Sequence, residues 1–295
     1  MLLALSLLPF YFCLLHPPSL SRPLLTKALN DLLSLYFLMN FDWKQKVVFI
    51  TGASSGIGGA LAIEFGRRGA SLGLLARRAD ALSEIVNEIE KGSGRAVALP
   101  ADVRDANAVR AAADELRAKF GRIDLLIANA GVGGTIDGAR LDPVEFARVI
   151  NINLLGAVNA VAAVAPEMVE QGSGQLVAIS SLAAYRGLPK SGAYCASKAA
   201  LSAFFESLRL DLKGSGVGVT IIHPGFIKTP LTAGRDAQMP FLMELDDAVK
   251  KIIRAIEARK KSYAFPWQLA SLVRLGMLMP SSVYDRVATK NSFRE

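Results

Sequence analysis

Cysteine and histidine are scarce in this chain, with two of each among 295 residues. Cys13 and Cys195 lie far apart in the sequence, which offers no disulfide framework and fits a reducing compartment. His16 and His223 have no neighbouring residues at metal-ligand spacing, so the usual zinc patterns are excluded and we expect no bound metal. His223 ends an apolar run before Pro224, and we expect it to be a structural histidine.

Long runs of one charge are also lacking, although the formal net charge is +8. The basic clusters are short, such as Arg77-Arg78 and Lys260-Lys261, and the other Lys and Arg residues are scattered. A nucleic-acid interface needs basic residues gathered on one face. The charge therefore indicates a solvated surface with one candidate phosphate contact, and we expect no nucleic-acid partner.

The N-terminal region lacks an apolar run long enough for a bilayer span. Residues 1–15 are mostly apolar but stop at His16-Pro17-Pro18, short of the roughly 20 residues that a spanning helix needs. No Lys or Arg precedes them, unlike in a signal sequence. Residues 1–38 form an apolar extension that either anchors the protein to a membrane or precedes a true start at Met39, and a cleaved secretory signal is the weakest explanation. The expected location is the cytoplasm, with membrane association if the extension is an anchor.

From Lys46 onward, short apolar runs alternate with longer helical patterns. This alternation is typical of a parallel sheet with helices on both faces. Strands are expected at 47–51, 71–76, 96–99, 123–128, 175–180, 217–223 and 262–265, and helices at 57–68, 80–91, 106–120, 143–171, 192–213 and 246–260. The sequence therefore predicts one α/β domain over residues 39–265, built on a doubly wound parallel sheet, and an apolar helical extension at 266–295.

A glycine-rich turn of the form T-G-x-x-x-G-x-G follows the first expected strand, at residues 51–58. Glycines let the backbone turn tightly and approach a pyrophosphate, and the next helix presents unpaired N–H groups and a positive dipole end to phosphates. The turn alone is weak evidence, because any tight strand-to-helix connection favours glycine. Its position directly after a strand favours a dinucleotide-phosphate site.

The end of the second expected strand lacks the acidic residue that holds a ribose 2′-hydroxyl in NAD sites. Arg77 and Arg78 follow Ala76 instead. A guanidinium can bind a 2′-phosphate through paired hydrogen bonds, so the pair favours NADP. An exposed basic helix start would explain the same residues without a ligand.

Tyr194 and Lys198 lie four residues apart in an expected helix, and Ser181 lies thirteen positions before Tyr194. Residues at i and i+4 share a helix face, which brings the ammonium group near the phenol. A phenol holds its proton to about pH 10, and a nearby cation lowers that value. Tyr194 is therefore the candidate proton donor to a carbonyl oxygen, Ser181 the candidate group that holds this oxygen, and Ser180 its adjacent rival.

Together with other motifs, these residues resemble the short-chain dehydrogenase/reductase family. The resemblance covers about residues 44–265 and rests on the glycine turn, Asp102, Asn129-Ala130-Gly131, Asn153, Ser181, Tyr194-x-x-x-Lys198 and the segment from Pro224 to Thr229. It implies a Rossmann fold and reversible hydride transfer between a nicotinamide cofactor and a carbonyl or secondary alcohol. A homodimer or homotetramer is the implied assembly.

The resemblance also implies a role for each matching residue. The cofactor phosphates would be bound by Gly52, Ser54, Ser55, Gly56, Ile57 and Gly58, the adenine by Asp102 and Val103, and the carboxamide by Pro224, Gly225, Ile227 and Thr229. Asn129 would brace the central sheet beside the cofactor, with Ala130 and Gly131 leaving room for the ribose. The catalytic set would be Asn153, Ser181, Tyr194 and Lys198, and the last two would also contact the cofactor. Asn153 would hold a water in the proton path to Lys198.

Two positions depart from the family pattern. Ala128 precedes Asn129 where an asparagine is common, and Ser55 stands where many NADP-preferring members carry a basic residue. The second departure leaves Arg77 and Arg78 to bind the phosphate. NADP is thus the expected cofactor, with NAD as the alternative.

Apolar residues dominate the segment after Thr229, where the family has its substrate lid, and the stretch from Phe265 to Pro280. The first favours a small-molecule substrate that is a lipid-like, acyl or other hydrophobic carbonyl or alcohol. The second is expected in the core or a subunit interface, with a pocket wall or peripheral membrane contact as alternatives. A membrane-associated long-chain lipid ketone reductase is the narrower alternative function. A non-catalytic nicotinamide redox sensor and a membrane-surface structural protein are alternatives of other classes.

Overall fold

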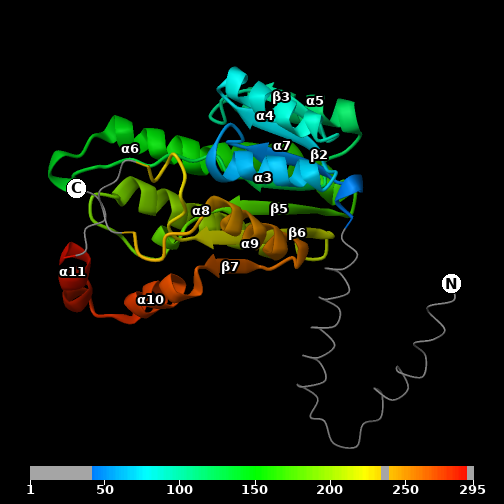
Figure 1. Cartoon of the computed structure of the whole chain (residues 1–295). Helices are drawn as coiled ribbons and strands as arrows, with labels where there is room; N and C mark the ends of the chain where they lie inside the picture. Colours follow the sequence, from blue (N-terminus) through cyan, green and yellow to red (C-terminus); the bar gives the residue numbers. More distant parts are fainter. Residues whose placement is uncertain (1–41, 234–238, 291–295) are drawn as a thin grey trace, which may run out of the picture. The chain divides into compact units, whose positions relative to one another are not determined.

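The computed structural model describes residues 42–233 and 239–290, so the N-terminal extension expected at residues 1–38 lies outside the described residues. The described part is built on a seven-stranded, all-parallel sheet in the order β3-β2-β1-β4-β5-β6-β7 (Figure 1). Its strands are β1 (Val47–Thr51), β2 (Ser71–Ala76), β3 (Arg95–Pro100), β4 (Leu125–Ala128), β5 (Gly174–Ile179), β6 (Val217–Pro224) and β7 (Ser262–Phe265). The expected doubly wound parallel sheet is confirmed.

Helices cover both faces of this sheet. On one face α3 (Gly56–Arg67) packs against α4 (Ala79–Lys91) and α9 (Leu245–Glu257), and on the other α5 (Ala106–Phe120) packs against α7 (Gly156–Glu170) (Figure 1). Two further helices, α6 (Pro143–Ile150) and α8 (Gly192–Asp211), contact each other. Because helices cover both faces, the inner strands are buried on both sides, and β1, β2, β4 and β5 are buried at every residue.

The strand order reverses between β1 and β4. In open α/β sheets, ligands bind outside the carboxyl ends of the strands at such a reversal. Here the chain leaves β1 into the glycine-rich turn and leaves β4 into Asn129-Ala130-Gly131. The topology therefore brings these two expected cofactor segments to the same place.

The single helix expected at 143–171 is interrupted, so that prediction was wrong in its middle. A π-helical turn, η3 (Asn151–Leu155), separates α6 from α7 and carries Asn153. Over residues 143–170 this helical stretch has the length and hydropathy of a membrane span, but half of its most apolar window is buried inside the fold. A core helix explains that apolar character.

Two helices follow β7 in the part of the chain that the structure describes. These are α10 (Trp267–Leu278) and α11 (Ser281–Lys290) (Figure 1). Leu269 and Ala270 of α10 are buried against Leu182, which lies in η4 (Leu182–Ala184). Part of the apolar C-terminal stretch is therefore core, and short 3-10 turns also occur at η1 (Trp43–Gln45) and η2 (Gly138–Arg140).

Candidate active site

One cavity of about 1150 Å³ is lined by residues that follow β1, β2, β4, β5 and β6. All of the expected site residues line it except Gly58 and Asn153. The sequence separates these segments by up to about 180 positions, and the parallel sheet brings their carboxyl ends together. The fold thus gathers segments that are separate in the sequence, and the roles expected for their residues stay predictions.

The glycine-rich turn leaves no room for side chains at two of its glycines. Gly52 has a φ of +68°, and a Cβ there would lie 2.7 Å from Ala130 Cα. A Cβ at Gly58 would lie 2.4 Å from the side-chain nitrogen of Asn129, which donates hydrogen bonds to the carbonyls of Thr51 (3.0 Å) and Gly52 (3.1 Å). Asn129 therefore braces the turn. The absence of a side chain at Gly58 leaves the space that the Asn129 amide occupies.

The N-terminus of α3 faces the cavity with Gly56 and Ile57 among the lining residues. Ser55 is the N-cap, and its side chain makes no capping hydrogen bond to the first turn. Helix N-termini offer unpaired N–H groups and a positive dipole end, which favour anions. The turn therefore has the donor set that a pyrophosphate needs, and its glycines allow close approach.

Arg78 lies directly beside this turn. Its Nη2 donates to the carbonyl (3.1 Å) and the hydroxyl (3.0 Å) of Ser54 and to the hydroxyl of Ser55 (3.0 Å). Arg77 also lines the cavity. The two arginines and the two serines could together hold a phosphate outside the end of β2.

Asp102 forms a bidentate salt bridge with Arg104, a residue that no sequence motif marks. Arg104 Nε lies 3.0 and 3.1 Å from the two carboxylate oxygens, and its Nη2 lies 2.7 Å from one of them. The Arg104 side chain thereby holds the pKa of Asp102 below its ordinary value. Asp102 is therefore an ionised acceptor at neutral pH, in a fixed orientation at the cavity edge.

The two adjacent serines after β5 point in different directions. Ser180 is buried, and its hydroxyl bonds to the Lys198 carbonyl (3.1 Å) and to the Ser202 hydroxyl (2.8 Å). The Ser181 hydroxyl accepts a hydrogen bond from the Ala183 N–H (3.1 Å). An accepted bond leaves the Ser181 O–H able to donate to a ligand oxygen, so the geometry favours Ser181 over Ser180.

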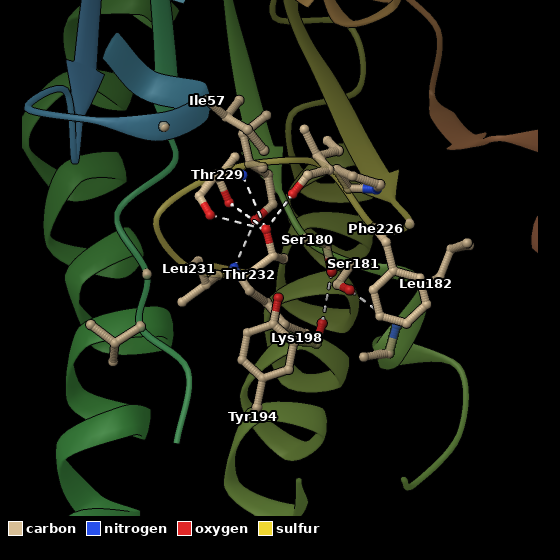
Figure 2. A pocket seen from close by; sticks show the side chains of 18 of the residues that line it. Ile57, Ser180, Ser181, Leu182, Tyr194, Lys198, Phe226, Thr229, Leu231 and Thr232 are labelled. Atoms are coloured by element: carbon tan, nitrogen blue, oxygen red, sulfur yellow. Dashed lines mark hydrogen bonds between the residues drawn. The ribbon is translucent and has the colours of Figure 1, made fainter. Parts of the chain in front are cut away.

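Tyr194 and Lys198 lie one turn apart on α8, and both line the cavity (Figure 2). Lys198 Nζ is 5.8 Å from the centre of the Tyr194 ring and donates to the Ile179 carbonyl (2.8 Å). The residue is 4 % exposed, and burial lowers the pKa of Lys198 to about 8. A Cβ at Gly131 would lie 3.4 Å from Nζ, so Gly131 lies directly beside the ammonium group.

Asn153 is fully buried and lies behind the cavity rather than on its surface. Its Oδ1 accepts from the Val132 N–H (2.7 Å), and its Nδ2 donates to the Val132 carbonyl and to the Ser197 hydroxyl (both 3.0 Å). These bonds tie the loop after β4 to α8. The π turn orients the Asn153 amide toward both the loop and α8. The expected role of Asn153 in holding a water stays a prediction.

The segment after β6 crosses the cavity beside the glycine turn. A tight turn holds it: the Thr229 N–H donates to Thr232 Oγ1 (3.0 Å), which donates to the Ile227 carbonyl (2.6 Å) (Figure 2). A Cβ at Gly56 would lie 3.6 Å from Thr229 Cβ. The expected phosphate and carboxamide segments are therefore neighbours.

His223 is a structural residue at this site. Its Nδ1 lies 3.4 Å from the Ser181 carbonyl, and its ring lies 5.0 Å from that of Tyr185. Burial lowers the pKa of His223 to about 4, which keeps the imidazole neutral at physiological pH. Its position under Ser181 fits the structural role expected from the sequence.

The remaining part of the cavity is mostly apolar. Its lining includes Leu182, Leu188, Phe226, Leu231, Met239, Leu269, Leu272, Val273 and Met279. Arg186 and Tyr284 also line it, and sequence reasoning missed both because neither belongs to a motif. The apolar stretch from Phe265 to Pro280 was the only signal, and α10 supplies the pocket wall that stood as one of its alternatives.

Comparisons with known proteins agree with this site. The family described as short chain dehydrogenase matches residues 46–240. An uncharacterized oxidoreductase of Myxococcus xanthus is 42 % identical over 249 residues, covering 84 % of this chain and 98 % of the relative. The 11-beta-hydroxysteroid dehydrogenase A of Sesamum indicum is 39 % identical over 67 % of this chain and 57 % of its own length. The chain therefore belongs to the short-chain dehydrogenase/reductase family of oxidoreductases.

Solved structures of similar fold carry nicotinamide cofactors. A short-chain dehydrogenase/reductase of Burkholderia phymatum in complex with NAD has a TM-score of 0.74 and 27 % identity, with 80 % of this chain and 94 % of that chain covered. A 3-ketoacyl-(acyl-carrier-protein) reductase of Brucella melitensis complexed with NADH has a TM-score of 0.68 and 27 % identity, over 75 % and 95 % of the two chains. These likenesses agree with a nicotinamide cofactor in the cavity.

Proposed function

We propose that this protein transfers hydride reversibly between NADP and a hydrophobic carbonyl compound or secondary alcohol. The observation that carries the proposal is that Ser181, Tyr194 and the buried Lys198 line the same cavity as the glycine-rich turn. A bound nicotinamide supplies the hydride for reduction or accepts it for oxidation. The protein supplies the proton, the positioning and the electrostatic environment.

Tyr194 donates its proton to the carbonyl oxygen in reduction and accepts it in the reverse direction. Lys198, with a pKa of about 8, is mostly protonated at neutral pH, and its charge favours the phenolate form of Tyr194. The Ser181 hydroxyl donates to the same oxygen as negative charge develops there. The three side chains thus divide proton transfer, activation and oxyanion stabilisation.

The preference for NADP rests on the charges around the end of β2. Arg78 contacts both serines of the glycine turn, Arg77 lies beside it on the cavity, and no acidic residue stands where a ribose hydroxyl would be held. A 2′-phosphate would gain charge-assisted hydrogen bonds from this group. NAD has no phosphate to form them.

The hydrophobic nature of the substrate rests on the apolar part of the cavity. Relatives named as 11-beta-hydroxysteroid dehydrogenases and as a ketoacyl reductase, HetN of a Nostoc species, support a carbonyl or alcohol on an apolar body. A homo-oligomer in the cytoplasm is proposed as the working form, with peripheral membrane contact through the termini as a further proposal. A long-chain lipid ketone is the narrower substrate proposal.

A carbonyl screen with NADPH and NADH tests the function directly. The full-length protein is expected to oxidise NADPH faster than NADH and to favour hydrophobic ketones over small polar ones. If the protein binds NADPH but consumes none of it with any carbonyl compound, the proposal fails and a redox sensor becomes the better explanation. A preference for NADH would overturn the cofactor assignment alone.

A further inference from the structure

Arg186 joins the loop between Ser181 and Tyr194 to the last two helices. Its Nη1 donates to the carbonyls of Gly276 and Met279 (3.0 Å to the latter), which lie at the C-terminal end of α10. The C-terminal carbonyls of a helix lack partners within the helix and carry the negative end of its dipole. Arg186 therefore caps the C-terminal end of α10. We call the loop that carries Arg186, between Ser181 and Tyr194, the catalytic loop.

Tyr284 of α11 completes this connection. The Arg186 guanidinium carbon lies 3.8 Å from the centre of the Tyr284 ring, which is close stacking for an arginine on an aromatic face. The Tyr284 hydroxyl donates to the Gly187 carbonyl (2.6 Å). The contact is thus made twice, through the ring and through the hydroxyl, to adjacent residues of one loop.

The helices held in this way form one side of the cavity. We call α10 and α11, residues 267–290, the C-terminal wall. Leu272 and Val273 of α10 line the cavity together with Met279, which follows α10, and Tyr284 of α11, so the arginine contact lies among the lining residues themselves. Only Leu269 and Ala270 of the wall belong to the buried cluster around Leu182. Beyond that cluster and Val273, which packs against it, the Arg186 contacts and the hydrogen bond from Tyr284 to Gly187 connect the wall to the loop between Ser181 and Tyr194.

We propose that the contact between Arg186 and Tyr284 fixes the C-terminal wall against the catalytic loop and determines the enzyme's affinity for carbonyl compounds with an extended apolar body. The inference rests on the proposed function, because it assigns a substrate class to the same site. A short ketone needs only the polar centre at Ser181 and Tyr194. A long chain or a fused ring system also needs the apolar surface of Leu272 and Val273, which the wall presents only when it is held in place.

The test measures chain-length dependence with butan-2-one, octan-2-one and dodecan-2-one as substrates. Arg186→Met and Tyr284→Leu are expected to raise the KM for dodecan-2-one about tenfold while kcat for butan-2-one changes less than about twofold. The double variant is expected to lose more than either single variant but less than the sum of the two losses, because both substitutions remove the shared stacking contact and each also removes hydrogen bonds of its own. Arg286→Met is the matched control, because it removes an exposed arginine from α11, the helix that carries Tyr284. This variant is expected to behave as wild type.

Two results would overturn the inference: equal losses for short and long ketones, and additive losses in the double variant. Hydrogen–deuterium exchange supplies a readout that needs no turnover. Peptides from residues 267–290 are expected to exchange faster in Arg186→Met and unchanged in Arg286→Met, and unchanged exchange in both would contradict the inference. If wild type reduces no ketone, the proposed function fails while the exchange data still decide whether the contact holds the wall.

Discussion

Replacing Lys198 by methionine should stabilise the cofactor-free protein at neutral pH while it abolishes activity. Burial lowers the pKa of Lys198 from 10.5 to about 8, so the charged form costs the folded state about 3 kcal/mol below pH 8. Methionine fills a similar volume without charge, and the lost hydrogen bond to the Ile179 carbonyl costs about 1 kcal/mol. We therefore expect Lys198→Met to be about 2 kcal/mol more stable at pH 7.

The pH dependence identifies the cause of this gain. Between pH 8 and 10.5 the unfolded wild-type chain binds more protons at Lys198 than the folded chain, so wild-type stability gains with rising pH from this group. The advantage of the variant should shrink across that window, disappear near pH 10, and give way to a deficit of up to about 1 kcal/mol once Lys198 is neutral in both wild-type states. Urea denaturation of both proteins from pH 7 to 10.5 measures the difference between their free energies of unfolding. The titratable groups that the two proteins share contribute equally to both values and cancel in this difference. A variant that is less stable at pH 7, or whose advantage is independent of pH, refutes the reasoning.

Three further predictions concern the cofactor and substrate contacts. Arg78→Ala should weaken NADPH binding about 10- to 100-fold with little effect on NADH binding, and Arg77→Ala should weaken NADPH binding by a smaller factor. Fluorescence titration measures both affinities, and equal losses for the two cofactors would contradict the phosphate role. Ser181→Ala should reduce kcat about 100-fold or more, whereas Ser180→Ala should mainly lower stability, and the reverse pattern would exchange their assignments. Gly58→Ala should lower the free energy of unfolding by about 1–3 kcal/mol and weaken cofactor binding, since its Cβ would meet the bracing amide at 2.4 Å; wild-type behaviour would show that the turn can relax.

The sequence predicted the sheet well because its parallel strands are short, mostly apolar runs, and those of β1 and β4 are almost wholly apolar. The π turn at Asn151–Leu155 was not predicted, because hydrophobic periodicity over residues 143–171 stays helical when one turn widens. The Asn153 amide in this turn bonds to the backbone of Val132, which lies 21 positions earlier in the loop after β4. Such a pairing leaves no local signal.

The candidate site was predictable wherever a backbone requirement imposed a residue type. Gly52 and Gly58 have no room for a Cβ, and this requirement shows in the sequence as the glycine spacing. Arg186 and Tyr284 meet only through the fold, 98 positions apart, and nothing near either residue marks the contact. The substrate side of the site therefore had to be seen in the structure.

The catalytic role of Tyr194 is the central claim, and one substitution tests it most directly. Tyr194→Phe keeps the ring in the cavity and removes only the oxygen that carries the proton. The account predicts that NADPH consumption with a hydrophobic ketone falls by about 1000-fold or more while the Kd for NADPH changes less than about twofold. Undiminished ketone reduction by Tyr194→Phe would contradict it.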